Sequence, residues 1–309
     1  MHLSAHGTRG PSGSIGDEVA WALLRALARR ASSGAAITDG AGVGLDRHGR
    51  LVLEDANEPL IHARPELLRG WSPVAPFSSS ASELLDLYMP LCVGARSTGL
   101  VVAHLGQSVD HRIAADGGKP LQITGAADAL HTHRLRALFD AVVVGAHTIA
   151  SDDPRLTTRL VEGRSPTRVV IDPRQRLSPD HRVFTDRDAF TLRIVSTDQT
   201  PTQGVTTLAV PGSDDGLDLR ALLAELGRRG LRRVFVEGGG ETVRRFLHLG
   251  LLDRLQLVVA PQTLGAGPLG VSVQSTLARF GEDACRRIAL GDDLLFDWDL
   301  SRVRTAVSP

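Results

Sequence analysis

A short run in the C-terminal third of the chain combines a carboxylate with three consecutive glycines. Glu237 is followed directly by Gly238, Gly239 and Gly240. Glycines allow a ligand to approach the backbone closely, because they carry no Cβ. If a helix begins after them, its free N–H groups and the positive end of its dipole would attract a phosphate. The run predicts a phosphate-binding turn beside an acidic group, although a strand-to-helix turn without a ligand fits the same glycines.

The residues on both sides of the glycines indicate which elements position them. Residues 234–236 are apolar and include β-branched and aromatic side chains, which predicts a buried strand. Val243, Phe246 and Leu247 recur at helical spacing, and Gly250 stands where a helix would end. The expected order is therefore strand, glycine turn, helix. The spacing matches neither the Gly-x-Gly-x-x-Gly fingerprint nor the P-loop.

Further apolar runs predict a sheet of several strands. They cover residues 100–105, 141–145, 168–172, 192–196, 206–210, 255–260 and 294–300, and the last is expected to end the sheet. Helices are predicted from Thr124 to Phe139 and after Asp218, with Thr124 and Asp218 as N-caps. This alternation is typical of an α/β fold with a mostly parallel sheet flanked by helices.

Ligands of such sheets bind where the strands end at their carboxyl side. Four polar or glycine-rich segments are expected at that edge, namely residues 106–108, 145–148, 172–174 and 237–240. Their coincidence on one edge indicates a binding site more strongly than any one segment does.

The composition excludes several classes of protein. The formal net charge of the 309 residues is zero, so no broad field attracts nucleic acid or an anionic membrane. No apolar run reaches the roughly 18 residues of a membrane span, and the N-terminus shows no signal-peptide pattern. Cys92 and Cys285 are the only cysteines, which favours a reducing cytoplasm. His131 and His133 are two positions apart on a predicted helix, so we expect solvated side chains and no metal site.

The first part of the chain, residues 1–92, is expected to be an N-terminal extension of unknown role. Residues 1–13 are rich in Gly, Ser and His and are expected to be disordered. A helix should follow from Ser14 as its N-cap, with Arg25, Arg29 and Arg30 on its polar side. Residues 73–82 are predicted to be a linker or loop, and Ser82 is expected to begin a short apolar helix.

Several motifs of the remaining chain occur in an order that is known from one enzyme family. Residues 144–159 contain Gly-x-x-Thr followed by Asp-Asp-Pro-x-Leu-Thr-x-Arg, and residues 108–110, 123–125, 133–137, 236–239 and 259–265 match in the same order. This set resembles the riboflavin-biosynthesis pyrimidine reductases, which form the C-terminal domain of the bifunctional deaminase–reductase. The resemblance covers about residues 99–300 and implies a dihydrofolate-reductase-like reductase domain over residues 93–309. Residues 1–90 contain neither His-x-Glu nor Pro-Cys-x-x-Cys, which excludes zinc-dependent deamination.

The resemblance implies an activity and a set of roles. The expected activity is the NADPH-dependent reduction of 5-amino-6-(5-phosphoribosylamino)uracil, in which the ribosyl side chain becomes ribityl. A cytoplasmic homodimer without metal is expected. The implied cofactor-binding residues are Gln107, Ser108, Gly145, Thr148, Asp152, Gly238, Gly239, Gly240, Glu241, Thr242 and Val243. The implied substrate-binding residues are His104, Arg136, Leu156, Arg159 and Glu237, and the implied catalytic residues are Glu237 and Asp152.

Some positions depart from the family pattern on the substrate side. His104 stands where many members have lysine, His111 and His147 stand where glycine is usual, and Pro120 begins an unusual stretch. These departures leave two alternatives open: a reductase of the same fold acting on another heterocycle, such as a dihydropterin or a specialised pyrimidine, or a nucleotide-binding protein without turnover. Arg174 and Arg176 follow a predicted strand and are candidates for the phosphate that distinguishes NADPH from NADH, or simply surface arginines.

Overall fold

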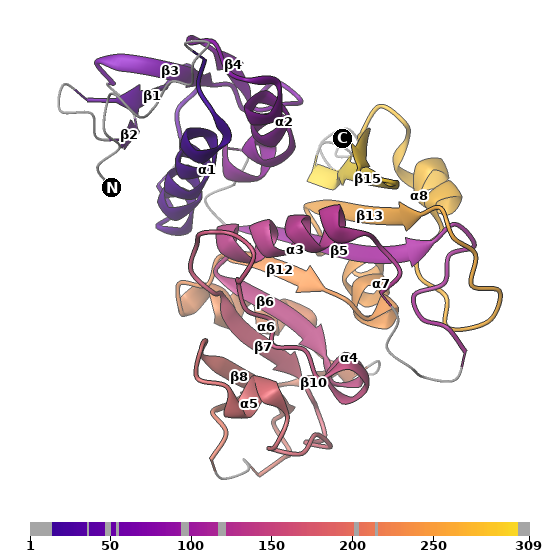
Figure 1. Cartoon of the computed structure of the whole chain (residues 1–309). Coiled ribbons are helices and arrows are strands. Elements are labelled where there is room, and N and C mark those ends of the chain that lie inside the picture. Colours follow the sequence, from indigo (N-terminus) through magenta and orange to yellow (C-terminus); the bar gives the residue numbers. More distant parts are fainter. Residues whose placement is uncertain are drawn as a thin grey trace, which may run out of the picture. The chain divides into compact units, whose positions relative to one another are not determined.

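The chain forms two compact units, described separately below. The computed structural model describes residues 14–35, 37–46, 51–53, 56–93, 99–116, 122–200, 204–213 and 216–301. Unit 1 ends at Leu100 and unit 2 begins at Val101, eight residues beyond the boundary predicted from the sequence (Figure 1). The disorder expected for residues 1–13 and the departure at Pro120 both lie outside the described residues.

Unit 1 is a helix pair with a small antiparallel sheet. Its elements are α1 (Asp17–Ser32), β1 (Gly42–Leu45), β2 (Leu51–Leu53), β3 (Glu58–Ala63), β4 (Trp71–Pro73) and α2 (Ser79–Val93). The sheet order is β2-β1-β3-β4. Trp21 of α1 meets Tyr88 of α2 edge to face, with 6.1 Å between ring centroids. Buried apolar side chains from both helices form the core of this unit.

Three predictions for unit 1 were wrong in detail. The N-cap of α1 is Gly16 and not Ser14, and Arg25 is buried on the helix's packed side. The predicted linker at residues 73–82 is shorter, because β4 continues to Pro73 and α2 already begins at Ser79. Taken by themselves, the serines of residues 78–82 favour a loop. In the structure, Oγ of Ser78 accepts a hydrogen bond from the backbone N–H of Ala81, which stabilises the first turn of α2.

Unit 2 contains a nine-stranded sheet with the order β14-β15-β13-β5-β12-β6-β7-β8-β9. Its strands are β5 (Leu100–Ser108), β6 (Ala141–Gly145), β7 (Thr167–Ile171), β8 (Thr191–Ser196), β9 (Thr207–Val210), β12 (Arg233–Glu237), β13 (Arg254–Ala260), β14 (Cys285–Leu290) and β15 (Asp293–Asp299). A separate pair consists of β10 (Gly212–Ser213) and β11 (Gly216–Leu217). The pairs β13-β15 and β15-β14 are antiparallel, whereas β13-β5, β12-β6, β6-β7, β7-β8 and β8-β9 are parallel, so the predicted mostly parallel α/β fold is confirmed.

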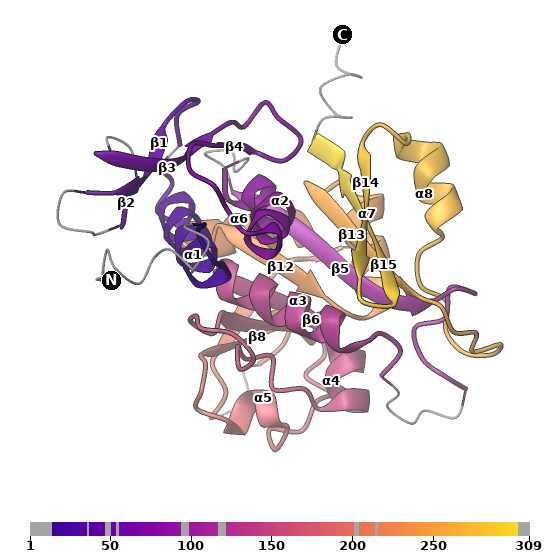
Figure 2. The ribbon, with the colours of Figure 1, turned by 45° about the horizontal axis from the view of Figure 1, so that its top comes forward.

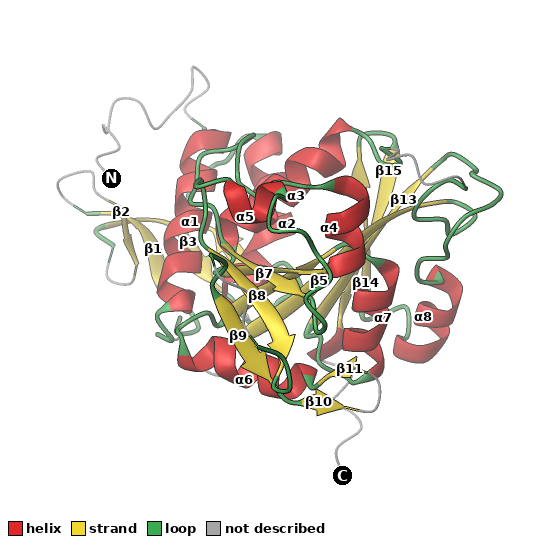
Figure 3. Ribbon diagram, turned by 90° about the horizontal axis from the view of Figure 1, so that it is seen from below, coloured by secondary structure: helices red, strands yellow, loops and turns green. Residues whose placement is uncertain are grey.

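Helices cover both faces of this sheet (Figure 3). They are α3 (Ala126–Leu138), α4 (Ala146–Asp152), α5 (Arg182–Thr185), α6 (Leu219–Arg228), α7 (Gly240–His248) and α8 (Val273–Phe280). On one face, α6 and α7 pack against alternate strand residues such as Val143, Val236 and Leu257. The opposite face lies under α3. Figure 2 shows β13, β5 and β12 side by side in the middle of the sheet. Buried polar residues of these strands lie on the face that α3 covers.

The structure corrects several sequence-based boundaries in unit 2. β5 continues to Ser108, so residues 106–108 lie inside the strand and not beyond its end. The N-cap of α3 is Gly125, whereas Thr124 was expected. β15 is the last strand along the chain, as predicted, but it is not at the edge of the sheet, because β14 pairs along its outer side. Asp218 does cap α6, since its side chain accepts hydrogen bonds from the backbone N–H groups of Arg220 and Ala221.

The described residues show neither a membrane-spanning helix nor a metal-binding cluster. None of their helices is both long and apolar enough to cross a membrane. In the same ranges, no group of three or more His, Cys, Asp or Glu side chains is arranged to hold a metal ion.

Candidate active site

The glycine turn after β12 has the geometry that its sequence predicted. Gly238 and Gly239 have φ angles of +71° and +70°, a region that favours glycine. Gly239 is the N-cap of α7 and offers no side chain to the first backbone N–H groups of the helix. Those groups have no intrahelical partners and mark the positive end of the helix dipole. The turn therefore presents backbone donors that suit an anionic ligand.

A second turn, after β6, packs directly against the first. β6 and β12 are parallel neighbours with Val143 opposite Val236, so their carboxyl ends adjoin. A Cβ on Gly145 would lie 2.6 Å from Oγ1 of Thr242, and a Cβ on Gly239 would lie 2.9 Å from Oγ1 of Thr148. Glycine is thus required at both positions for the approach of these two threonines. The hydroxyls of Thr148 and Thr242 both lie at the glycine turn.

Gly239 and Gly238 offer a matched pair of substitutions. Either one changed to alanine places a Cβ at positive φ, at a cost of about 1–2 kcal/mol. Only Gly239→Ala also forces a contact with Thr148, whereas the nearest atom to a Cβ on Gly238 is 3.7 Å away. We expect Gly239→Ala to lower the free energy of unfolding by roughly 1–3 kcal/mol more than Gly238→Ala, as overpacking usually does. Urea unfolding measures this difference, and equal losses would contradict the close approach.

An ion pair joins the end of β12 to α3. Nε of Arg136 donates to Oε2 of Glu237 over 2.8 Å, and Nη2 of Arg136 donates to Oε1 of Glu237. Nη1 of Arg136 donates to the carbonyl of Thr157 over 3.0 Å. Arg136 is only 7% exposed. All three guanidinium nitrogens are therefore engaged, and both carboxylate oxygens of Glu237 accept hydrogen bonds from one guanidinium.

Next to this pair lies a cavity of about 300 Å³ with a wall of arginines. Its lining consists of Arg136, Asp152, Asp153, Pro154, Arg155, Leu156, Arg159 and Arg182. Arg155, Arg159 and Arg182 present exposed side chains there. Burial lowers the pKa of Arg159, and the nearby charges of Arg136 and Arg155 lower it further. Such mutual repulsion between cations is relieved by a bound anion, so the cavity suits a phosphate.

The sequence analysis named some of these residues and missed others. The structure brings the predicted Arg136, Asp152, Leu156 and Arg159 to one cavity. Arg155 and Arg182 were not identified, because their positions in the chain give no signal of where they point. Asp153 holds Arg182 at the cavity: its carboxylate accepts hydrogen bonds from the backbone N–H of Arg182 over 2.8 Å and from the Nε of Arg182 over 3.0 Å.

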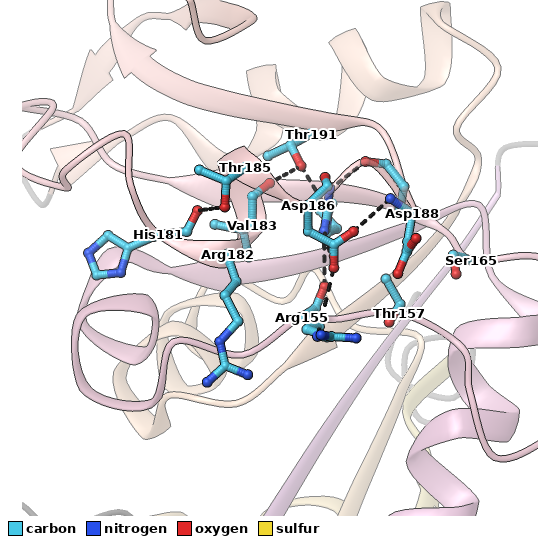
Figure 4. Close-up of polar contacts among 12 residues, drawn as sticks. Arg155, Thr157, Ser165, His181, Arg182, Val183, Thr185, Asp186, Asp188 and Thr191 are labelled. Atoms are coloured by element: carbon cyan, nitrogen blue, oxygen red, sulfur yellow. Dashed lines mark hydrogen bonds and ion pairs between the residues drawn. The ribbon is translucent and has the colours of Figure 1, made fainter.

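The segment that carries these arginines is held in an unusual conformation. Leu156 has a φ of +56° and is nevertheless buried, so the surrounding structure must fix it. The buried Arg168 of β7 donates from Nη1 to the carbonyl of Arg155 over 3.2 Å and from Nε to Oγ1 of Thr191 over 2.8 Å. Figure 4 shows Arg155 beside Asp186, whose Oδ2 lies 4.0 Å from Nε of Arg155.

Polar residues of α3 and β5 continue the site beneath the helix. Nε2 of His104 and Oδ1 of Asp128 are 2.8 Å apart, and both side chains are buried. The solvated histidines expected on α3 are not found: His131 and His133 are 1% and 6% exposed. His131 is hydrogen-bonded to Gln256 over 2.9 Å, and Nδ1 of His133 accepts from the backbone N–H of Arg159 over 2.8 Å. His131 thus faces Gln256 of β13, whereas His133 faces the backbone at residues 159 and 160. Helical spacing alone could not reveal either partner.

Gln107 and Ser108 make contacts within the fold. The amide of Gln107 donates to the carbonyl of Val271 over 2.9 Å and accepts from its N–H over 3.0 Å. The hydroxyl of Ser108 donates to the carboxylate of Asp110 over 2.5 Å. This hydrogen bond and those from the backbone N–H groups of Leu264 and Gly265 lower the pKa of Asp110 to about 2. These motif residues therefore fasten the end of β5 to residues 264–271.

Two of the departures from the family pattern are located. His111 has a φ of +62°, which explains on physical grounds why glycine suits this position. Its Nδ1 lies 3.1 Å from Nε2 of Gln107. His147 is exposed in the first turn of α4.

The residues at the glycine turn fit a dinucleotide diphosphate. The N-terminus of α7 lacks a side-chain cap, and both threonine hydroxyls adjoin it. A Cβ on Gly240 would lie 3.0 Å from the carbonyl of Leu269 and 3.0 Å from Ile113, so this position is tight for any larger residue. Backbone donors, hydroxyls and small residues together are the chemistry that binds phosphates at helix N-termini.

Comparisons with known proteins show what the chain is similar to. Residues 100–289 match the family described as the RibD C-terminal domain. The chain is 31% identical over 211 residues to the 2,5-diamino-6-ribosylamino-4(3H)-pyrimidinone 5′-phosphate reductase of Methanothermobacter thermautotrophicus, covering 64% of this chain and 96% of that one. It is 34% identical over 180 residues to the Archaeoglobus fulgidus protein of the same name, covering 53% and 81%.

A solved structure has the same fold. It is a diaminohydroxyphosphoribosylaminopyrimidine deaminase/5-amino-6-(5-phosphoribosylamino)uracil reductase from Thermotoga maritima, with a TM-score of 0.54 and 24% identity. The match covers 71% of this chain and 61% of that protein. This likeness extends to the fold alone, which is dihydrofolate-reductase-like.

Proposed function

We propose, from the premise that the chain belongs to the RibD C-terminal domain family, that it is a reductase of riboflavin biosynthesis. Its substrate is a phosphoribosylamino-pyrimidine, 5-amino-6-(5-phosphoribosylamino)uracil, whose ribosyl side chain is reduced to ribityl. The names of the archaeal relatives support the reaction class, and they also make the 2,5-diamino form of the pyrimidine a substrate to be tested.

One observation carries this proposal. The arginine-lined cavity lies directly beside the Arg136–Glu237 pair, and Glu237 in turn begins the glycine turn. A phosphate in the cavity would hold one end of the substrate while its sugar reaches Glu237. Because Arg136 is already engaged by Glu237 and Thr157, we assign the phosphate chiefly to Arg159 and Arg155, with Arg136 as the anchor of Glu237.

The cofactor is proposed to be NADPH, with its diphosphate on the first N–H groups of α7 and the hydroxyl of Thr148. When bound, it supplies the hydride for C1 of the sugar. Arg174 and Arg176 are exposed just beyond β7, where Asp172 accepts from the backbone N–H of Arg176 over 2.9 Å. We propose these two arginines as the contacts of the additional phosphate of NADPH.

The other side chains position and stabilise the reacting sugar. The charged carboxylate of Glu237 stabilises the positive charge that develops on C1 and its attached nitrogen. Arg136 holds that carboxylate in place through two hydrogen bonds. Asp152 is four residues after Thr148 on α4, so it lies on the same side of that helix and lines the cavity. We also propose a homodimer, on the resemblance alone.

Turnover with defined substrates tests this function. We expect the purified chain to oxidise NADPH, followed by its nicotinamide absorbance, with the phosphoribosylamino-uracil or its 2,5-diamino form. NADH should have a KM higher by at least about tenfold, because it lacks the phosphate that the two arginines would pair with. Oxidation with dihydrofolate instead would favour a different heterocycle. Tight binding of NADPH without oxidation on any of the three substrates would favour a non-catalytic role.

A further inference from the structure

His104 and Glu237 lie side by side on neighbouring parallel strands. β5 and β12 are adjacent in the sheet, and the backbone N–H of Gly238 donates to the carbonyl of His104 over 3.5 Å. In a parallel ladder this bond places His104 opposite the residue before Gly238, which is Glu237. Paired residues project from the same face. Both side chains therefore point toward α3, where Arg136 and Asp128 meet them.

These four side chains form a row of alternating charge. Arg136 contacts Glu237, Glu237 neighbours His104, and His104 contacts Asp128. If the imidazole of His104 were neutral, two carboxylates would flank an uncharged ring in a buried setting. With the imidazole protonated, every charge in the row has an opposite charge next to it. The charges of this row therefore alternate only when His104 is an imidazolium.

Other groups around His104 agree with this protonation state. Burial lowers the pKa of His104. Asp128 raises it through its charge and its hydrogen bond, Glu237 also raises it, and Arg136 lowers it. The resulting pKa lies above the ordinary value. His131, whose ring is 5.4 Å away, has a pKa lowered to about 4, chiefly by burial and then by the charge of His104. The remaining neighbours, Phe235 and Gln256, are uncharged.

The second ring nitrogen of His104 is available for chemistry. Nε2 is held by Asp128, and among the described residues Nδ1 makes no hydrogen bond. An imidazolium whose Nε2 is held by Asp128 keeps Nδ1–H as a second donor. A positioned histidine of this kind is the commonest general acid in enzymes.

We propose that His104, held as an imidazolium by Asp128, is the acid of the reduction, and that Asp128 is its positioning residue. This proposal rests on the proposed function. Nδ1 of His104 gives its proton to the ring oxygen of the ribosyl group. The bond between C1 and that oxygen breaks with its electron pair on the oxygen, and the lone pair of the attached nitrogen forms a C=N⁺ bond. Hydride from the cofactor then adds to C1 and restores the neutral amine, and solvent returns the proton to His104.

The pH dependence of turnover tests both residues. Because the pKa of His104 is raised, kcat should be constant at lower pH and fall as pH rises through that pKa. Asp128→Asn removes the opposite charge, so this alkaline limb should move down by at least about one pH unit. His104→Gln should lose about 10²–10⁴-fold in kcat at pH values below the pKa of His104, and the difference from the unchanged protein should shrink above it. His104→Lys keeps a cationic donor and should recover part of that activity, with its alkaline limb at higher pH.

His131→Gln is the matched control, because it removes a neighbouring buried imidazole from α3 and keeps a polar partner for Gln256. Its alkaline limb should coincide with that of the unchanged protein. A purely structural role for Asp128 would lower stability without moving the limb, and that outcome would overturn the proposal. Activity of His104→Gln at the level of the unchanged protein would overturn it as well.

An NMR titration separates this proposal from the proposed function. The imidazole signals of His104, assigned by their loss in His104→Gln, should titrate above the ordinary pKa of about 6.5 in the unchanged protein and lower in Asp128→Asn. This readout needs no substrate, and the titration of the unchanged protein decides the matter even if Asp128→Asn does not fold. A His104 that titrates at or below 6.5 would refute the imidazolium whether or not the pyrimidine is reduced.

Discussion

Glu237→Gln is expected to lower kcat by about 10²–10³-fold, the usual effect of removing one electrostatic contact to the reacting centre. Glutamine has nearly the same shape, but it cannot neutralise Arg136, which is 7% exposed. An uncompensated buried charge of this kind costs about 3–5 kcal/mol. Stability should therefore fall together with activity. Urea unfolding and steady-state kinetics at a temperature where the variant stays folded measure the two effects.

A double variant separates the structural from the chemical part of this effect. Glu237→Gln combined with Arg136→Gln removes both charges, so the free energy of unfolding should recover by roughly 1–3 kcal/mol relative to the single variant. Turnover should not recover, because the carboxylate beside the sugar is still missing. Glu225→Gln is the control, since it breaks only surface pairs with Arg228 and Arg229 that contribute about 1 kcal/mol or less. Recovery of turnover in the double variant would argue against Glu237 as a catalytic group.

Arg159→Gln is expected to raise KM for the phosphorylated pyrimidine by about 10–100-fold, because a charge-assisted hydrogen bond contributes about 1.5–3 kcal/mol. NADPH affinity should stay the same, since the glycine turn is built from other residues. The guanidinium is held near the cavity by Nη1, which donates to Oγ1 of Thr157 over 2.8 Å. Steady-state kinetics with varied pyrimidine and, separately, varied NADPH measure the two effects.

The phosphate itself can be removed to check the assignment. With a substrate that lacks the phosphate, the unchanged protein and Arg159→Gln should have similar KM values. Arg164→Gln is the matched control, because Arg164 is exposed in the same connecting segment and does not line the cavity. If Arg159→Gln weakened both substrates equally, the role of Arg159 would be in maintaining the segment and not in binding phosphate.

The sequence predicted much of unit 2 because its signals are local. Residues 141–145 are a continuous apolar run and form β6 with those bounds. Asp218 is an acidic side chain immediately before a periodic apolar segment, and it caps α6 as expected. The three glycines after residue 237 form the positive-φ turn because few other residues adopt that conformation. In each case one stretch of chain contains the whole physical cause.

Other expectations were wrong where a distant contact decides the outcome. Helical spacing on α3 indicated solvated histidines, but the sheet face beneath them has polar residues, so His131 is satisfied by Gln256 125 residues away. Strand residues 106–108 looked like a loop because glycine and polar side chains are rare in strands. Gly106 is needed there because a Cβ would lie 2.9 Å from Thr124, and Gln107 is satisfied by Val271.

For this protein, the sequence alone determined the α/β class, the motif order of the reductase family and the glycine turn, because each depends on residues close together in the chain. Only the tertiary structure decided that Arg136 is the partner of Glu237, 101 residues away. It also decided that Arg155 and Arg182 share a cavity with Arg159, and that Asp128 lies against His104. Charges in a buried site act over a few ångströms, and those distances are set by how α3, β5 and β12 pack and not by their order in the chain.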